Sequence, residues 1–201
     1  TDSILVKSHL NPRALEFADK TCIDAVRETD NGKIPEEAEA LLLIDVDGNE
    51  KNVTNDINRI DALCRENSAL KTLITHTDEE RNRLWDIRKS IYPSLTKVAS
   101  VKFDEDLSVP RSKVRDVLKK VYELSNTYSL EMSAFGKIGE GHVHLNVTGS
   151  SVGDADVSAY DLVSQILNDV ESNGGTSISG LASHETEIMK DLKKMFDPKG
   201  I

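Results

Sequence analysis

Two strand-like segments, 130–137 and 142–148, follow each other with only a short glycine-rich stretch between them. The stretch from Phe135 to Gly149 reads FGKIGEGHVHLNVTG. Parallel neighbours need a crossover of a dozen or more residues, usually a helix, whereas antiparallel neighbours can be joined by a tight turn. This pair therefore favours an antiparallel or mixed sheet over a purely parallel one.

Hydrophobic periodicity and turn residues predict the remaining elements. Thr77 and Glu80 form a capping box that begins one helix, and Pro110 suits the first turn of another. The predicted helices lie at 11–28, 53–67, from 77 through 91, from 110 through 124, 162–170 and 188–196. The other predicted strands are 41–48, 71–76, 101–109 and 175–179.

Helices and strands alternate along most of the chain, which predicts an α+β fold. We expect a ferredoxin-like antiparallel or mixed sheet with helices packed on one face. A strand-helix-strand pattern occurs in both halves, which permits an internal duplication. With 201 residues, 38% of them hydrophobic, the chain can form one sizeable core, so we expect a single domain over residues 1–201.

The net charge and composition of the chain limit the classes of partner and the cellular location that we expect. The net charge of −10 argues against nucleic acid or an anionic membrane surface. The sequence has no apolar run of the roughly 18 residues that a transmembrane segment needs and no visible secretory signal. We expect an intracellular, cytoplasmic protein, although an organelle-targeting segment upstream of Thr1 stays open. Cys22 and Cys64 are expected to be reduced thiols.

Alternation on the strand 142–148 places His142, His144 and Asn146 on one face. Val143, Leu145 and Val147 point to the other face, which suits a hydrophobic core. Imidazole and amide groups are costly to bury without partners. They could bind a divalent metal together with Glu140, contact a substrate or cofactor, or be hydrogen-bonded or solvated for structural reasons.

Two further candidates carry charge. Arg88, at the border of an apolar helix face, could clamp a carboxylate through two parallel hydrogen bonds, or could pair with Asp86 or another acid. Asp104 and Asp106 share one face of a predicted strand and could hold a metal or perturb each other's pKa, although such acids are more often hydrated. The sequence contains no nucleophile motif, so nucleophilic hydrolysis has no support.

Taken together, these segments resemble a known family, the C-terminal cap domain of FAD-linked oxidases of the D-lactate dehydrogenase, glycolate oxidase and D-2-hydroxyglutarate dehydrogenase group. The segment 12–19 is similar to the entry helix of that domain, and 197–201 is similar to its "DP.GI" ending. The segment 84–88 resembles its "LW..R", 105–110 its "(D)v.vP" strand, and the glycine–histidine stretch its "GH.GDGN.H.N".

The resemblance implies a cap that covers the flavin of FAD and binds a small 2-hydroxy acid, which is oxidised to a 2-oxo acid by hydride transfer to the flavin. Arg88 and Asn146 would bind substrate, and His144 would be catalytic or, with His142 and Glu140, ligate zinc or another divalent metal. FAD would be bound mainly by a domain that normally precedes Thr1. We therefore expect this chain to be inactive without that domain; the electron acceptor stays open.

The sequence also departs from the family's pattern. The first histidine of the glycine–histidine motif is Lys137, its aspartate is Glu140 and its asparagine is His142. Gly180 is followed by Leu181-Ala182-Ser183-His184, without the acid–histidine pair that the family carries there. These differences support an alternative hypothesis: a catalytically degenerate cap relative that acts as a binding or subunit-interface module.

Overall fold

A computed structural model describes residues 10–29, 34–99, 101–148, 154–178 and 195–196. Within these ranges the strands form one six-stranded sheet in the order β2-β1-β4-β5-β3-β6, and every neighbouring pair is antiparallel. The α+β class and the antiparallel sheet are thus confirmed. The strands are β1 (Ala14–Asp19), β2 (Ala40–Asp45), β3 (Val101–Ser108), β4 (Glu131–Gly136), β5 (His142–Thr148) and β6 (Thr176–Ser177).

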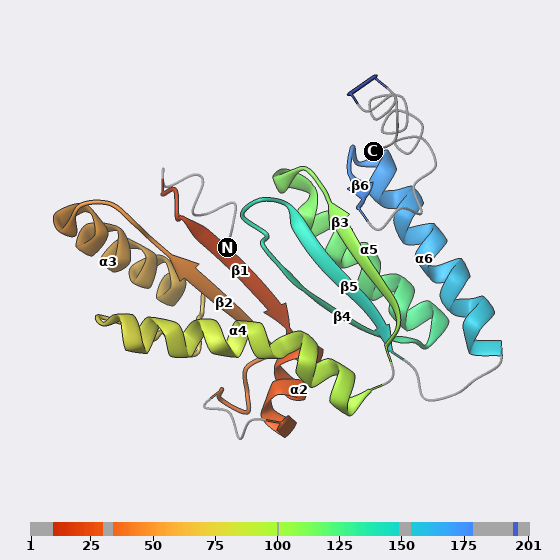
Figure 1. Cartoon of the computed structure of the whole chain (residues 1–201), viewed down its shortest axis with the longest axis horizontal. Helices are drawn as coiled ribbons and strands as arrows, with labels where there is room; N and C mark the ends of the chain where they lie inside the picture. Colours follow the sequence, from red (N-terminus) through yellow and green to blue (C-terminus); the bar gives the residue numbers. More distant parts are fainter. Residues whose placement is uncertain (1–9, 30–33, 100, 149–153, 179–194, 197–201) are drawn as a thin grey trace.

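Helices lie on both faces of this sheet, not on one as expected (Figure 1). Three of them pack on one face, where they share a hydrophobic cluster with all five longer strands: α3 (Glu50–Glu66), α5 (Val114–Tyr128) and α6 (Asp154–Ser172). A second cluster joins α4 (Asp78–Val98) and α2 (Lys20–Thr29) to Ala18 and Phe135 on the opposite side. No helix within the described ranges is long and apolar enough to cross a membrane.

The second half of the chain has the element order β3-α5-β4-β5-α6-β6. This β-α-β-β-α-β succession is the split unit in which two helices cover one side of four antiparallel strands. The strands β1 and β2 extend the same sheet beyond β4. The ferredoxin-like assignment and the internal duplication stay predictions.

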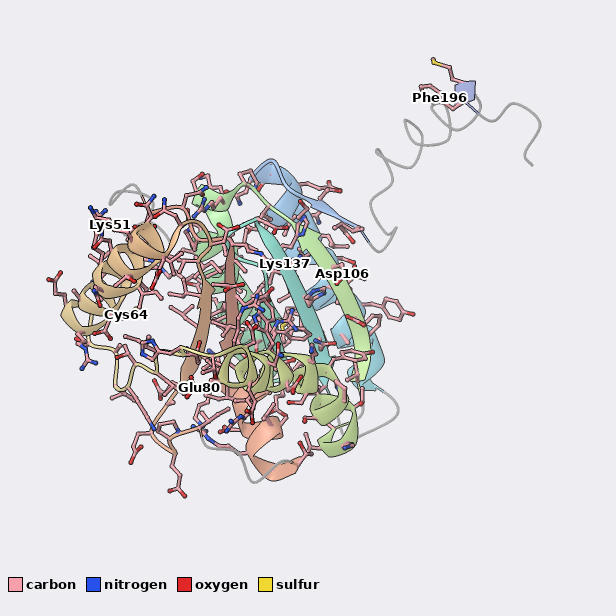
Figure 2. All side chains as sticks on the ribbon, turned by 60° about the vertical axis from the view of Figure 1, so that its left-hand side comes forward. Lys51, Cys64, Glu80, Asp106, Lys137 and Phe196 are labelled. Carbon is pink, nitrogen blue, oxygen red and sulfur yellow. The ribbon has the colours of Figure 1, made fainter. Side chains whose placement is uncertain are left out.

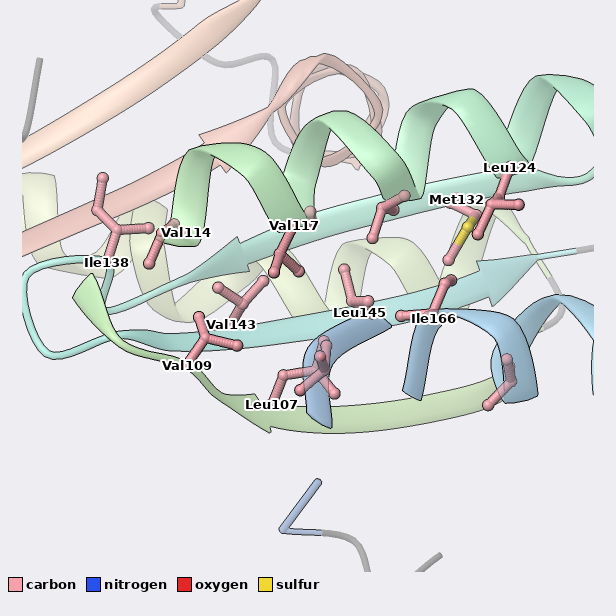
Figure 3. Packing of buried hydrophobic residues seen from close by; sticks show 14 of the residues in the cluster. Leu107, Val109, Val114, Val117, Leu124, Met132, Ile138, Val143, Leu145 and Ile166 are labelled. Atoms are coloured by element: carbon pink, nitrogen blue, oxygen red, sulfur yellow. The ribbon is translucent and has the colours of Figure 1, made fainter. Parts of the chain in front are cut away.

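The larger core lies between the sheet and α5 and α6 (Figure 3). Val143 and Leu145 of β5 are at most 3% exposed. They share their cluster with Val117 of α5 and Ile166 of α6. Apolar burial of this extent is the dominant stabilising term in folding. The predicted core face of β5 is confirmed.

The prediction of one helix over 11–28 is wrong for its first half. Residues Ala14–Asp19 form β1, which pairs along its whole length with β2. Leu15 and Phe17 belong to the larger core, whereas Ala18 faces the second cluster, as strand alternation requires. The helix α2 begins directly after Asp19, whose Oδ1 accepts the Cys22 N–H at 3.0 Å. The acid therefore marks the change from strand to helix.

Asp19 also connects three elements. Its Oδ2 accepts hydrogen bonds from the backbone N–H of Ala134 at 2.7 Å and from the Tyr122 hydroxyl at 3.1 Å. Burial raises the pKa of Asp19 and of the Cys22 thiol. Cys22 and Cys64 are both free, as predicted.

Several other element predictions are settled. The capping box of Thr77 and Glu80 is present, and a short 3₁₀ turn (Arg111–Lys113) follows Pro110 and leads into α5. The predicted strand over Lys71–His76 is wrong: these residues form no regular structure, and Leu73 is 65% exposed, so no apolar face is there to bury. Only Met195 and Phe196 of the predicted last helix fall within the described residues, and both are helical.

Candidate functional site

The sheet face opposite α5 and α6 carries the polar candidates, because β3, β4 and β5 alternate in register. Phe135 of β4 lies opposite His144 of β5, and His144 lies opposite Asp106 of β3. On the other side of Phe135, β1 contributes Ala18. These side chains form a row across four strands, which we call the polar face. Asp106 of β3 is labelled in Figure 2.

Arg88 reaches the polar face from α4. Its Nε donates to Glu16 Oε2 at 2.6 Å, and its guanidinium carbon lies 4.8 Å from the centroid of the Phe135 ring. The Arg88 side chain is 18% exposed and that of Glu16 only 3%. Asp86 is bonded instead to Lys89 at 3.1 Å. The sequence allowed Arg88 either to clamp a ligand carboxylate or to pair with an acid of the chain. The structure contains such an ion pair; it is buried, and the acid is Glu16.

His144 also contacts the phenyl ring of Phe135. Its imidazole centroid is 4.9 Å from that of Phe135, with 31° between the planes. Its Nδ1 is hydrogen-bonded to Asp106 Oδ1. In the neutral form of the ring, with Asp106 as an ionised acceptor, Nδ1 carries the proton and Nε2 has the free lone pair. The guanidinium of Arg88 and the imidazole of His144 are thus neighbours of one ring, on one face.

Asn146 is fully buried on β5, between Ser133 of β4 and Asp104 of β3 in the register. Neither its Nδ2 nor its Oδ1 has a hydrogen-bond partner among the described residues. A buried amide without partners costs free energy, typically about 1–3 kcal/mol. The site therefore contains a polar side chain whose hydrogen-bonding capacity the described protein groups leave unused.

A metal site built on His142, His144 and Glu140 finds no support in the geometry. His142 Nδ1 is 3.9 Å from Glu140 Oε2, but both side chains are close to half exposed. Across the described ranges, no three potential ligands gather as a metal site would require. His184 lies outside the described residues. Within the described ranges the side chains do not fit a metal ion, so we derive no chemistry from one.

The two aspartates on β3 have different neighbours. Asp106 is engaged with His144, as described above. Asp104 is hydrogen-bonded to Tyr92 of α4, and its negative charge raises the pKa of the Tyr92 hydroxyl. The prediction that Asp104 and Asp106 lie on one face is consistent with their register opposite Asn146 and His144. Neither forms a cluster of three potential metal ligands with other residues that the structure describes.

The turn between β4 and β5 depends on two glycines with positive φ. Gly136 has φ +150° and Gly141 has φ +81°. A Cβ at Gly141 would lie 2.0 Å from the carbonyl oxygen of Val109, and one at Gly136 would lie 2.5 Å from that of His142. The predicted tight turn is confirmed. Lys137, in the same turn, is exposed and is labelled in Figure 2. Its Nζ lies 3.9 Å from Glu140 Oε1.

Sequence reasoning missed two members of the site, Glu16 and Phe135. Glu16 stands between Leu15 and Phe17, and an acid inside an apolar strand is a signal of a buried pair. Phe135 appeared only as the start of the glycine-rich stretch. Its role becomes visible only when β4 lies between α4 and β5.

The described elements thus form an antiparallel sheet with a polar face beneath one helix. The chain belongs to the family of FAD linked oxidases, C-terminal domain, which residues 3–180 match. The resemblance inferred from the sequence is thereby confirmed.

Three curated relatives illustrate the group. The chain is 26% identical over its whole length to the glycolate oxidase subunit GlcD of Bacillus subtilis, covering 46% of that protein. It is 24% identical to D-lactate dehydrogenase of Archaeoglobus fulgidus, over 94% of the chain and 44% of the relative. It is 25% identical to the mitochondrial D-2-hydroxyglutarate dehydrogenase of Danio rerio, over 94% of the chain and 38% of the relative. The chain thus spans less than half the length of these relatives.

Proposed function

We propose that this chain is the substrate-binding cap domain of an FAD-dependent 2-hydroxy-acid dehydrogenase or oxidase, and that it acts together with an FAD-binding domain. The names of the three relatives support the substrate class, because glycolate, D-lactate and D-2-hydroxyglutarate are all 2-hydroxy acids. They share a carboxylate next to a carbon that bears a hydroxyl group. A site for such acids needs a cation for the carboxylate and a hydrogen-bond acceptor for the hydroxyl.

The observation that carries the proposal is the arrangement of Arg88 and His144 around Phe135. The guanidinium offers charge-assisted hydrogen bonds to the carboxylate of the acid. The Nε2 lone pair of His144 can accept the proton of the 2-hydroxyl, and Asp106 then stabilises the resulting imidazolium through its bond to Nδ1. The unpartnered amide of Asn146 supports a further polar contact with the ligand.

FAD, when bound, supplies the hydride acceptor, which no side chain of this chain can replace. The contribution of the cap is to bind the acid, to orient its hydroxyl-bearing carbon and to receive the hydroxyl proton. Holding the reacting groups in one geometry is itself a large part of catalysis. In this proposal the isolated chain binds the acid without oxidising it.

A degenerate cap is the second candidate, and two observations favour it. Lys137, Leu181 and Ala182 stand where the resembling motifs carry chemistry. In addition, Arg88 already has a carboxylate partner within the chain. Such a domain would serve as a binding or subunit-interface module. It would not need to bind 2-hydroxy acids.

The test uses the protein that contains this chain together with its FAD-binding domain. Dye reduction is measured with glycolate, D-lactate and D-2-hydroxyglutarate, in the wild type and in Arg88→Lys. Lysine keeps a positive charge beside Glu16 but loses the planar fork, so we expect KM to rise at least about tenfold, or about 1.4 kcal/mol. The matched control is Arg83→Lys, because Arg83 is an exposed arginine of the same helix.

An unchanged KM in Arg88→Lys would remove Arg88 from the substrate site. Absence of both turnover and binding with all three acids would contradict the proposed function. Binding without turnover, in a protein that contains FAD, would favour the degenerate cap.

A further inference from the structure

Glu16 is a carboxylate that the fold places almost entirely out of water. Its neighbours Leu15 and Phe17 face the larger core, and alternation turns Glu16 to the polar face. Its side chain is 3% exposed. Removing a carboxylate from water costs several kcal/mol unless a partner compensates it. Among the described residues, its hydrogen-bond partner is Arg88.

The contact uses one particular edge of the guanidinium. A guanidinium has five N–H donors, which form a side edge at Nε and an end edge made by the two terminal nitrogens. Glu16 accepts from Nε. No hydrogen bond from Nη1 or Nη2 is present within the described part of the chain. The end edge is therefore the part of Arg88 left for another acceptor.

The ring of Phe135 further restricts the movement of the Arg88 guanidinium. With Cζ 4.8 Å from the ring centroid, the guanidinium lies against the aromatic ring and gains cation–π attraction. One hydrogen bond at Nε and one ring contact together restrict both the position and the plane of the guanidinium. A cation held in advance loses less entropy when it binds an anion than a mobile one does.

We propose that Glu16 is a positioning residue for the substrate carboxylate: it holds Arg88 by its Nε edge and so reserves Nη1 and Nη2 for one carboxylate of the ligand. This inference rests on the proposed function, and it deepens it. It assigns a role to a residue that does not touch the substrate.

The kinetic test compares Glu16→Ala with Glu16→Gln in the protein that contains the FAD-binding domain. Glutamine keeps an oxygen that accepts from Nε, whereas alanine removes it. With glycolate as substrate, we expect Glu16→Ala to raise KM about tenfold and to change kcat less than about threefold. Glu16→Gln is expected to restore KM to within about threefold of the wild type.

The matched control is Glu79→Ala, which removes an exposed acid paired with an exposed arginine on α4. It should leave KM unchanged. Equal KM values for wild type and Glu16→Ala would overturn the inference. So would equal losses in the alanine and glutamine variants, because a purely structural carboxylate gives no rescue by the glutamine oxygen.

A second measurement does not depend on turnover. Nitrogen-15 NMR of the 201-residue chain observes the arginine Nε–H groups, and Arg88→Lys identifies the signal of Arg88. We expect slow exchange of this proton in the wild type and in Glu16→Gln, and fast exchange in Glu16→Ala. Adding glycolate should shift the Arg88 signals of the wild type.

The two proposals fail in different ways in this measurement. A protected Nε–H that neither glycolate, D-lactate nor D-2-hydroxyglutarate perturbs would contradict the substrate site, although the hold of Glu16 on Arg88 would stand. An Nε–H that stays equally protected in Glu16→Ala would overturn the positioning role, whatever the activity of the protein.

Discussion

The two faces of β5 carry side chains of opposite character. On one face, Val143, Leu145 and Val147 are at most 3% exposed and belong to a hydrophobic cluster with α5 and α6. On the other face, His144 pairs with Asp106, and Asn146 has an amide with no hydrogen-bond partner among the described residues. The same backbone carries both sets.

The comparison shows how the fold divides its tasks. The apolar face stabilises the sheet through burial, which requires no particular partner for each atom. The polar face contains an ion pair and an amide that each depend on specific partners. Such groups are weak contributors to stability, so their presence points to binding. The predictions below ask whether the two faces can be separated experimentally.

Among substitutions on the polar face, the largest effect should come from breaking its ion pair. Arg88→Met leaves Glu16 buried without its partner, and we expect the free energy of unfolding to fall by about 3 kcal/mol. Adding Glu16→Leu should recover most of this loss, because a buried pair replaced by apolar residues of similar volume is often neutral. Urea unfolding of the two single variants and the double variant gives the coupling energy.

Additive effects in that cycle would contradict the assignment of a buried, mutually dependent pair.

A smaller effect of opposite sign is expected at Asn146. Asn146→Leu removes two polar atoms that the described protein groups leave unpaired, so the free energy of unfolding should rise by about 1–3 kcal/mol while binding of 2-hydroxy acids is lost. The neighbour on the other face gives the control: Leu145→Ala should cost about 2–5 kcal/mol and leave binding intact. Urea unfolding measures the stability of both variants, and calorimetric titration with 2-hydroxy acids measures their binding. A lower free energy of unfolding for Asn146→Leu than for the wild type would contradict the inference that the Asn146 amide is unpaired.

The smallest effect concerns the rim of the polar face. The charge of Asp104 raises the pKa of Tyr92 above its ordinary value of 10.0. Because the folded state disfavours the phenolate, this contribution to stability is present below the unfolded pKa and is lost as the pH rises through the folded pKa. In ultraviolet titration, the Tyr92 signal, obtained by difference from Tyr92→Phe, should shift to lower pH in Asp104→Asn. Identical midpoints would exclude the interaction.

Local patterns predicted much of the fold. The alternation of β5, the capping box of Thr77 and Glu80 and the antiparallel hairpin all depend on residues close in sequence. The segment 14–19 was misassigned as helix, since a short apolar run alone does not separate a buried strand from a helix. Pairing with β2, more than twenty residues away, decided the outcome. Lys71–His76 shows the opposite error, a strand-like stretch that has no neighbour to pair with.

The candidate site was predictable only in part, for a similar reason. Alternation placed His144 and Asn146 on one face, and the helix border made Arg88 a candidate. The partner of Arg88 could not be derived in this way, because Glu16 is 72 positions away and lies on a strand that was predicted as helix. Once β1 is a strand, the side to which Glu16 points follows from the same alternation rule.

The turn between β4 and β5 has a consequence for re-engineering this domain. Its shape is set by Gly136 and Gly141, where any side chain would collide with backbone oxygen atoms. Lys137, Glu140 and His142, the three positions that depart from the resembling motif, are exposed or partly exposed around those glycines. The loop can therefore lose or regain its chemical groups by substitution while its path stays the same. Grafting histidine, aspartate and asparagine at these positions would require no remodelling of the hairpin.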